Sequence, residues 1–481
     1  MDKNNNKTFV KEVADIDKDF PQWYTDVVRK TELVDYGPVK GTMVIRPYGY
    51  GIWENLKDEL DKRIKDTGHV NAYFPLFIPY SYLLKEAEHV EGFAPEVALV
   101  THVGNEELAE KLVVRPTSET IICEMYSKWI QSWRDLPVMI NQWANVVRWE
   151  KTTRPFLRTI EFLWQEGHTV HATREEAEEE TIKMLNVYEE FCRNILAIPV
   201  LMGPKSQREK FAGAVDTYSI EAMMRDGKSL QAGTSHYLGQ NFAKAFDIKF
   251  LDKDGTHKNP HQTSWGVTTR LIGALIMVHG DERGLVLPPK VAPIQAVIIP
   301  VAAFKPGVGK ACNKLLAALK KAGIRVHLDN RDQSPGWKFN EWEMKGVPIR
   351  IECGPRDIEN GVVTVARRDV VGEKFTLPIT GLAKAIKELL ATIQLDMYTK
   401  AKATMDSRIK VTGNMKELEK ALDDKCFALS MWCGSQDCEL EVKNKLSATT
   451  RNMPFDQSPV SDSCVVCGKP YKHKIYFARA Y

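Results

Sequence analysis

Three arginines stand where the chain is expected to bend or to begin a helix. Arg148 closes one predicted strand, Arg158 opens the next, and Arg270 directly precedes an apolar helix. A planar guanidinium group binds phosphate oxygens through paired hydrogen bonds. Three such groups directed at one ligand would stabilise the spread negative charge of phosphoryl or nucleotidyl transfer. Taken singly, each arginine could equally be an ordinary surface residue.

Two aromatic residues accompany these arginines. Phe162 and Trp164 lie two positions apart on a predicted strand, so their side chains should point to the same face. On that face they could stack against a purine base. The alternative is that both belong to the core of the sheet.

A cluster of cysteines marks the end of the chain, where five of the nine lie in the last 56 residues. Cys433 and Cys438 form one close pair, and Cys464 and Cys467 form a second. Two such pairs can provide the four ligands of a tetrahedral, structural zinc site. The alternative is that the four thiols bind no metal. Cys426 is expected to be buried and to lie outside this site.

The arginines need a scaffold, and the sequence predicts one. Residues 49–67 carry apolar side chains at helical spacing. Residues 141–150 and 158–170 are apolar and aromatic, and the short polar loop between them predicts an antiparallel hairpin. Thr173 and Glu176 form a capping box that opens a long acidic helix. Strands followed by capped helices, without regular alternation, predict an α+β domain on an antiparallel sheet.

The pattern changes near residue 290. The proline-rich segment 285–293 is a predicted linker. Strands and helices alternate beyond it, which predicts an α/β domain with a partly parallel sheet. Its expected strands are 294–299, 324–328, 349–352 and 362–366, and its expected helices are 307–322, 335–345 and 382–398. We therefore expect three domains, and they cover 1–288, 289–398 and, for a small α+β zinc-binding unit, 399–481.

Charge divides along the same boundary. The net charge of the 481-residue chain is +3, but residues 1–290 carry 36 Lys and Arg against 42 Asp and Glu, whereas residues 291–481 carry 30 against 21. A basic second part suits contact with nucleic-acid phosphates. The hydrophobic share of 43% and the charged share of 27% exclude a disordered or fibrous chain.

The expected location is the cytoplasm, without a membrane span. The longest apolar run, 271–278, falls short of the roughly 18 residues that a bilayer requires. The first 20 residues are polar and acidic and lack the apolar core of a secretion signal. Nine cysteines are too few for a disulfide framework in a chain of this length, which favours a reducing compartment.

Several short motifs, in this order, resemble the class II aminoacyl-tRNA synthetases. The similarity is specific to the prolyl-tRNA synthetases of the archaeal and eukaryotic-like type, and it extends over essentially the whole chain. The motifs are RPTSE at 115–119, FLRT at 156–159, FLWQEGH at 162–168, GTSH at 233–236 and WG at 265–266. The helix and proline stretch ending at Pro75, the hairpin and the Arg270 helix resemble the three signature motifs of the class.

The resemblance implies an ATP site. Arg148 would bind the α-phosphate and the amino-acid carboxylate, Glu150 would contact the adenine amino group, and Phe162 would stack on the adenine. Arg158 and Arg270 would hold the γ-phosphate end of a bent ATP. The implied ATP-binding set is Arg148, Glu150, Arg158, Phe162, Gln231, Thr234 and Arg270, with Arg148 and Arg270 as the catalytic residues.

The chemistry is consistent with this set. A carboxylate that attacks the α-phosphorus brings two anions together, so positive groups must offset their repulsion. Positioning and charge stabilisation suffice, and no obligate acid or base is needed. Magnesium is expected with ATP. Glu221 is the candidate magnesium ligand, and it could instead be an exposed carboxylate at the start of a helix.

The resemblance also implies a proline pocket. Thr117 and Glu119 would accept the two N–H donors of the proline ammonium, although Thr117 or Ser118 could instead cap a helix over 119–133. The implied proline-binding set is Thr117, Glu119, Arg148, Trp164, His168, His236 and Ser264. A small pocket rejects isosteres poorly, so alanine and cysteine are predicted to be misactivated. The family core fills the span between the second and third motifs, and no editing domain is expected there.

For the α/β domain, the resemblance implies binding of the anticodon. Glu343, Arg350 and Arg356 match the positions expected to read guanines, where a carboxylate accepts from N1 and N2 and an arginine donates to O6 and N7. Each could instead belong to a solvated charged face. The family's C-terminal unit carries four cysteines in many members, and class II members pair as homodimers through the first motif.

The sequence therefore predicts ATP-dependent ligation of L-proline to its cognate tRNA by a homodimer that holds structural zinc. One alternative is a synthetase for another small amino acid, and the argument against it rests on Trp164 and on the run Thr117-Ser118-Glu119. A second alternative is a non-catalytic, RNA-binding relative. The presence of all three arginines together with Glu119 argues against that.

Overall fold

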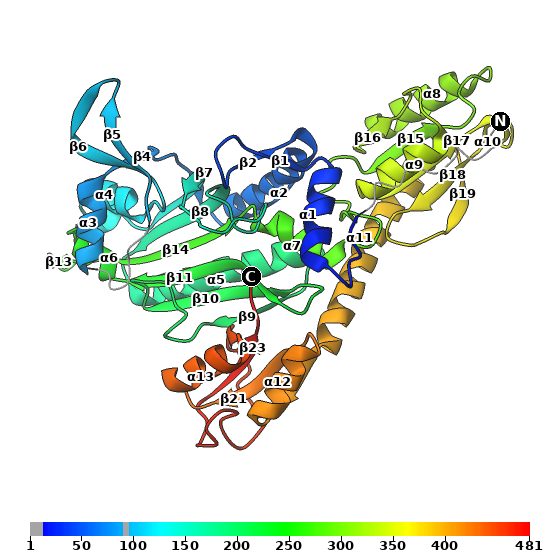
Figure 1. The fold of residues 1–481 in the computed structure, drawn as a ribbon. Helices are drawn as coiled ribbons and strands as arrows, with labels where there is room; N and C mark the ends of the chain where they lie inside the picture. The colour runs from blue at the N-terminus through cyan, green and yellow to red at the C-terminus, as the bar shows by residue number, and fades with distance from the viewer. Residues whose placement is uncertain (1–12, 90–95) are drawn as a thin grey trace.

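A computed structural model describes residues 13–89 and 96–481 of the chain (Figure 1). Three sheet-containing units follow one another, and a long helix runs from the second unit to the third (Figure 1). Residues 1–12, on which part of the prediction of no secretion signal rests, lie outside the described ranges. Within those ranges, no helix has the length and apolar character needed to span a bilayer.

The first unit is built on a seven-stranded sheet. In spatial order its strands are β3 (Val70–Asn71), β7 (Val138–Val147), β8 (Glu161–His171), β14 (His261–Thr268), β11 (Ser229–Gly239), β10 (Asp216–Met223) and β9 (Val200–Pro204). All neighbouring pairs are antiparallel except β3 and β7. The expected antiparallel α+β architecture is therefore confirmed.

Helices and smaller sheets surround this sheet. The helices are α1 (Phe20–Lys30), α2 (Pro47–Asp66), α3 (Tyr80–His89), α4 (Glu119–Trp129), α5 (Arg174–Asn194), α6 (Asn241–Ala245) and α7 (Arg270–His279), with a 3-10 turn at Trp133–Asp135. The smaller sheets are β1 (Val34–Tyr36) with β2 (Met43–Ile45), β4 (Phe77–Pro79) with β6 (Glu106–Val114) and β5 (Leu99–Val103), and β12 (Phe250–Leu251) with β13 (His257–Lys258).

The apolar stripes predicted from the sequence form the main core. Along α2 the four stripe residues are at most 1% exposed, and they are Ile52, Leu56, Leu60 and Ile64. In α7 every residue from position 271 to 277 is buried, as expected for a helix that is apolar on all sides. The predicted capping box opens α5, where Thr173 Oγ1 accepts from Glu176 N at 3.3 Å.

The hairpin is present, but both strands lie further from the bend than predicted. Arg148 follows the end of β7 and Arg158 precedes β8, so both arginines belong to the connecting loop. The loop has its own structure: Arg154 N donates to Arg158 O at 2.7 Å, and Phe156 adopts a left-handed conformation with φ 60°. This local turn replaces the ladder pairing that alternating residues alone would predict.

The second unit is a mixed sheet flanked by helices, as predicted. Its strand order is β16 (Val326–Leu328), β15 (Ala296–Pro300), β17 (Ile349–Cys353), β18 (Val362–Arg367) and β19 (Lys374–Pro378). The first three strands are parallel and the last two are antiparallel. Its helices are α8 (Val308–Lys321), α9 (Pro335–Met344), α10 (Pro355–Glu359) and α11 (Leu382–Ser407). The sequence interpretation lacked β19 and α10, and it ended α11 nine residues early.

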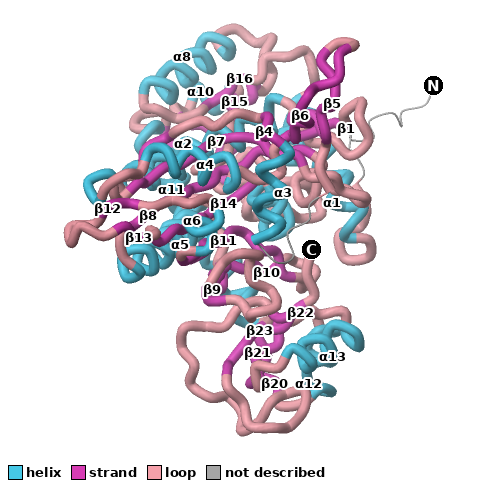
Figure 2. Tube along the Cα trace, turned by 90° about the vertical axis from the view of Figure 1, so that its left-hand side faces the viewer, coloured by secondary structure: helices cyan, strands magenta, loops and turns pink. Residues whose placement is uncertain are grey.

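The third unit is a small α+β fold beneath the seven-stranded sheet (Figure 2). Its strand order is β20 (Ile409–Thr412), β21 (Phe427–Trp432), β23 (His473–Ala478) and β22 (Thr449–Thr450), with helices α12 (Met415–Asp423) and α13 (Gln436–Leu446). Asn452 Nδ2 donates to Leu201 O of β9 at 2.8 Å, which connects this unit to the edge of the seven-stranded sheet.

Candidate active site

Strand β8 directs every second side chain into one cavity. Phe162, Trp164, Glu166 and His168 all line it. The intervening Gln165 points to the opposite face, where its side chain is hydrogen-bonded to Tyr188 of α5 at 2.6 Å. The period of two along a strand thus places a continuous row of chemically active residues on the open face of the sheet.

The cavity has a volume of about 690 Å³, which suits a small-molecule site. It gathers every residue predicted to bind ATP or proline: Thr117, Glu119, Arg148, Glu150, Arg158, Phe162, Trp164, His168, Gln231, Thr234, His236, Ser264 and Arg270. These residues come from the hairpin loop, β8, β11, β14 and the first turns of α4 and α7.

The arginines form the positive side of the cavity. Arg148 Nε donates to Pro116 O at 3.0 Å, and its guanidinium carbon lies 5.6 Å from the Phe162 ring centroid. Arg270 Nε donates to Leu157 O at 3.2 Å. Burial, followed by the charge of Arg148, lowers the pKa of Arg270 below its usual value. Like charges held together in this way favour binding of a polyanion.

The third arginine is paired with the carboxylate expected to read adenine. Arg158 Nε donates to Glu150 Oε2 at 2.7 Å. Such a pair at an exposed site contributes little stability. An incoming nucleotide can therefore exchange these contacts at small cost.

Thr117 and Glu119, the two residues predicted to bind the proline ammonium, also line the cavity. Thr117 donates its hydroxyl hydrogen to Glu119 Oε2, and both side chains are buried. The capping alternative is wrong, because Ser118 at the N-cap of α4 makes no side-chain cap bond and instead donates to Glu166. The helix itself ends at Trp129, four residues short of the expected position.

Glu166 is a cavity residue that the sequence interpretation did not single out. Its Oε1 accepts from Gln142 Nε2 at 2.7 Å, and its Oε2 lies 2.8 Å from His168 Nε2. Burial would raise the pKa of Glu166, but His168, Ser118 and Gln142 lower it. Burial would lower the pKa of His168, but Glu166 raises it. The alternation of positions 162, 164, 166 and 168 was the signal that could have found it.

His236 is a neutral wall residue. Its Nδ1 lies 3.0 Å from Thr217 Oγ1, and its ring packs 4.7 Å from that of Phe211. Burial lowers the pKa of His236 to about 3, so the imidazole is uncharged at physiological pH. Lys205 and Tyr481 also line the cavity, and Lys205 is a residue that the sequence interpretation did not single out.

Glu221 does not line the cavity and is fully buried below it. Both carboxylate oxygens have protein donors: Oε1 accepts from Ser219 and Oε2 accepts from Ser229 and Arg451. A magnesium ion would have to displace these donors. The geometry therefore gives the magnesium prediction for Glu221 no support.

The three predicted anticodon residues lie on separate elements of the second unit. Glu343 of α9 pairs with Arg283, which lies between the first and second units. Arg350 of β17 bonds Glu352 Oε1 at 3.0 Å and lies over the Phe339 ring, and Arg356 of α10 is exposed. Two of the three are thus held by neighbouring side chains in the absence of RNA.

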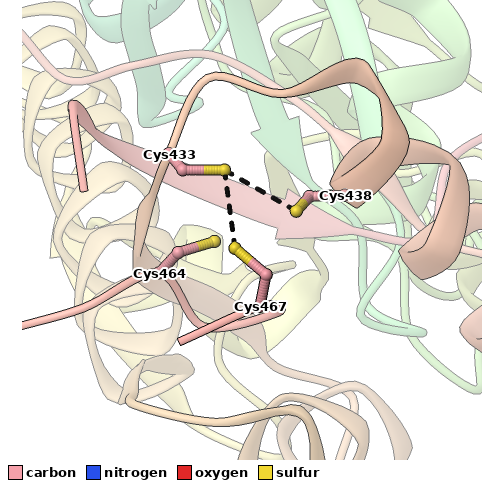
Figure 3. A group of neighbouring side chains, drawn as sticks. All are labelled: Cys433, Cys438, Cys464 and Cys467. Carbon is pink, nitrogen blue, oxygen red and sulfur yellow. Dashed lines mark hydrogen bonds between the residues drawn. The ribbon is translucent and has the colours of Figure 1, made fainter. Parts of the chain in front are cut away.

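The four clustered cysteines converge in the third unit (Figure 3). Cys433 follows β21, Cys438 lies in the first turn of α13, and Cys464 and Cys467 come from the loop before β23. All four Sγ atoms lie within 4.8 Å of one another, and the Cys433–Cys438 distance is 3.6 Å. A tetrahedral site with Zn–S bonds of about 2.3 Å requires Sγ separations of about 3.8 Å. The donor set and its spacing fit zinc.

A class II synthetase fold and an arginine-lined cavity on its antiparallel sheet are thus both present, and comparison with known families agrees. Residues 101–279 match the class II core domain of synthetases for G, H, P, S and T. Residues 295–389 match an anticodon-binding domain, and residues 415–481 match the C-terminal domain of prolyl-tRNA synthetase. The protein is a class II aminoacyl-tRNA synthetase.

The individual relatives identify proline as the amino acid substrate of this synthetase. The chain is 58% identical over 479 residues to proline–tRNA ligase 2 of Clostridioides difficile and 59% identical over 477 residues to proline–tRNA ligase of Alkaliphilus oremlandii, with 99% of each chain covered. A crystal structure of prolyl-tRNA synthetase from Cryptosporidium parvum, complexed with halofuginone and AMPPNP, superimposes with a TM-score of 0.93 at 42% identity and covers 100% of this chain and 99% of that one. The chain belongs to the prolyl-tRNA synthetases, and it is an ATP-dependent proline–tRNA ligase.

Proposed function

We propose that the cavity is divided between the two substrates of proline activation. The ATP part comprises Arg148, Glu150, Arg158, Phe162, Gln231, Thr234 and Arg270, and the proline part comprises Thr117, Glu119, Trp164, His168, His236 and Ser264, with Arg148 between the two. The observation that carries this division is that one cavity is lined by all of these residues, from segments more than 150 positions apart.

The reaction needs little beyond this arrangement. A proline carboxylate oxygen forms a bond to the α-phosphorus, and the bond from that phosphorus to the bridging oxygen breaks, which releases pyrophosphate. Arg148 offsets the repulsion between the two anions, and Arg158 and Arg270 stabilise the departing phosphates. A ribose hydroxyl at the 3′ end of the tRNA then attacks the proline carbonyl, and AMP leaves. Class II synthetases use ATP with Mg²⁺, which neutralises phosphate charge.

The division predicts that single variants separate the two Michaelis constants. Gln231→Ala should raise the KM for ATP, and Glu119→Gln should raise the KM for proline, each by about tenfold, because each removes a polar contact to one substrate. The measurement is proline-dependent ATP–pyrophosphate exchange, titrated with each substrate in turn. Glu161→Gln is the control, since Glu161 lies on β8 but outside the cavity. A variant that raises the other substrate's KM instead would contradict the division.

The second unit is proposed to bind the anticodon of the proline tRNA through Glu343, Arg350 and Arg356. Support comes from the match to an anticodon-binding domain and from the excess of Lys and Arg after residue 290. Arg350 stacked at 4.3 Å over Phe339 already presents a guanidinium plane of the kind that holds an unstacked base. Glu343 must release Arg283 before it can accept from guanine.

The third unit is proposed to hold one structural zinc ion at Cys433, Cys438, Cys464 and Cys467. The four thiols leave no open coordination position, so the metal would stabilise the fold of this unit and take no part in catalysis. A reducing, cytoplasmic location is also proposed, with support from the nine cysteines, none of which is paired in a disulfide.

The functional particle is proposed to be a homodimer formed through the first motif. Apolar side chains gather in and beside β3 and β4, where Val70 is 62%, Tyr73 70% and Phe77 49% exposed. Exposed apolar patches of this kind mark protein–protein contacts. The apolar stripe of α2, in contrast, packs into the core of its own chain.

The test of the homodimer is sedimentation, which should give twice the chain mass of 54.6 kDa for the wild type. The double variant Val70→Glu with Phe77→Glu should sediment as a monomer. The control variant Val411→Glu, in the third unit, should remain a dimer.

A further inference from the structure

A buried ionic contact joins the third unit to the catalytic sheet. Arg451, directly after β22, is 6% exposed, and Glu221 of β10 is fully buried. Arg451 Nη2 and Nε donate to Glu221 Oε2 at 2.9 and 3.2 Å. An ion pair this deep is costly to break from one side, because the remaining charge has no access to water.

The same carboxylate reaches the wall of the active-site cavity through Lys205. Lys205 follows β9 and lines the cavity, and its Nζ lies 3.5 Å from Glu221 Oε1. The ammonium also donates to Gln231 Oε1 at 2.9 Å. Arg451 and Gln231 are therefore connected through two intervening charged side chains.

The charges of Arg451, Glu221 and Lys205 affect one another. Burial would raise the pKa of Glu221, but Arg451 and Lys205 lower it to about 2, so the carboxylate is ionised. Burial lowers the pKa of Lys205, and Glu221 opposes that effect. One buried carboxylate is thus shared by two cations. If Arg451 were removed, Glu221 would be balanced by Lys205 alone, and the ammonium would be drawn from Gln231 toward the carboxylate.

Hydrogen bonds to backbone carbonyl groups hold Arg451 in place relative to the sheet. Arg451 N donates to Tyr476 O at 2.8 Å, and the neighbouring Asn452 Nδ2 donates to Ser219 O at 3.1 Å. A further hydrogen bond joins the third unit to the catalytic sheet, because Ser229 N of β11 donates to Arg479 O at 2.7 Å. The guanidinium therefore occupies a place set by the fold of the third unit.

We infer that Arg451 is a positioning residue for the ATP part of the cavity. Because Arg451 neutralises part of the charge of Glu221, the Lys205 ammonium maintains its hydrogen bond to Gln231. The inference rests on the ATP role proposed above for Gln231. It assigns the third unit a direct part in proline activation, in addition to any zinc-dependent stability. Its effect should fall on the KM for ATP and leave the KM for proline unchanged.

The test is proline-dependent ATP–pyrophosphate exchange by the full-length protein with variants of the two cations. Arg451→Met should raise the KM for ATP about tenfold, the size expected for a lost charge-assisted contact, and change the KM for proline less than about twofold. Arg451→Lys, which keeps the charge, should recover most of the affinity. Lys205→Met should raise the KM for ATP similarly, and the double variant should be no worse than Lys205→Met alone, because coupled residues are not additive.

Lys474→Met is the matched control. Lys474 is the third unit's other buried cation, and its partner Asp456, 2.9 Å away, lies within the same unit. This variant should keep the wild-type KM for ATP even where it lowers the melting temperature. Should Arg451→Met not fold, Arg451→Gln takes its place with the same expected result.

Three results would overturn the inference. They are an unchanged KM for ATP in Arg451→Met, additive effects in the double variant, and an equal rise in Lys474→Met. Gln231→Ala separates this inference from the proposed function. An unchanged KM for ATP in Gln231→Ala would refute the role of Gln231, whereas a rise there without one in Arg451→Met would refute only the inference.

Discussion

Arg148→Ala is expected to reduce proline-dependent ATP–pyrophosphate exchange by roughly 10³-fold, the upper end for loss of one transition-state donor. Arg148 is the residue proposed to contact both substrates, and its guanidinium is held by Pro116 O and flanked by Phe162 and Trp164. The affinity for tRNA should be nearly unchanged, because phosphate contacts over the whole RNA dominate it.

The control for this variant is Arg193→Ala, which removes an arginine of α5 that pairs with Glu189 outside the cavity. It should exchange pyrophosphate as the wild type does. Filter binding of labelled tRNA to both variants completes the comparison. Wild-type exchange by Arg148→Ala would refute the role given to Arg148, and a parallel loss of tRNA affinity would indicate a folding defect.

Cys433→Ser is expected to abolish zinc binding, which in the wild type should amount to about one ion per chain by metal analysis. Cys433 Sγ lies 3.6 Å from that of Cys438 and 3.8 Å from that of Cys467, so it is shared by both halves of the cluster. Loss of a structural zinc removes folding free energy directly. The melting temperature should fall by on the order of 10 °C, since about 1 kcal/mol shifts a small domain by 4–8 °C.

Cys426→Ser is the matched control, because Cys426 lies in the same unit, is buried, and does not belong to the four-thiol cluster. It should retain the full zinc content. A wild-type preparation without zinc, or a Cys433→Ser protein with the same zinc content as the wild type, would end the assignment.

Part of the candidate site follows from local rules, whereas most of the ATP and proline residues were implied only by the resemblance to prolyl-tRNA synthetases. The alternation of β8 placed Phe162 and Trp164 on one face, and the apolar helix after Arg270 gave that arginine its position. The capping box fixed the start of α5. The hairpin loop was harder, because the left-handed Phe156 and the Arg154–Arg158 turn arise from local geometry that periodicity does not record.

Contacts between distant segments could not be predicted. Glu221 lies beside a register shift in β10, and its main partner, Arg451, is 230 positions away in another unit. The sequence therefore left Glu221 as a candidate magnesium ligand, whereas in the fold its carboxylate contacts two cations, Arg451 and Lys205. Lys205 gave no signal either, because its role depends on Glu221 and Gln231, which approach it only in the folded sheet.

The central claim is that this cavity activates proline with ATP, and amino-acid-dependent pyrophosphate exchange tests it most directly. Each of the twenty amino acids is supplied in turn to the full-length enzyme with ATP, Mg²⁺ and labelled pyrophosphate. The account predicts strong exchange with proline and much weaker exchange with alanine and cysteine, because a small pocket separates close isosteres only by about 10- to 200-fold. Exchange that is faster with another amino acid than with proline would contradict it.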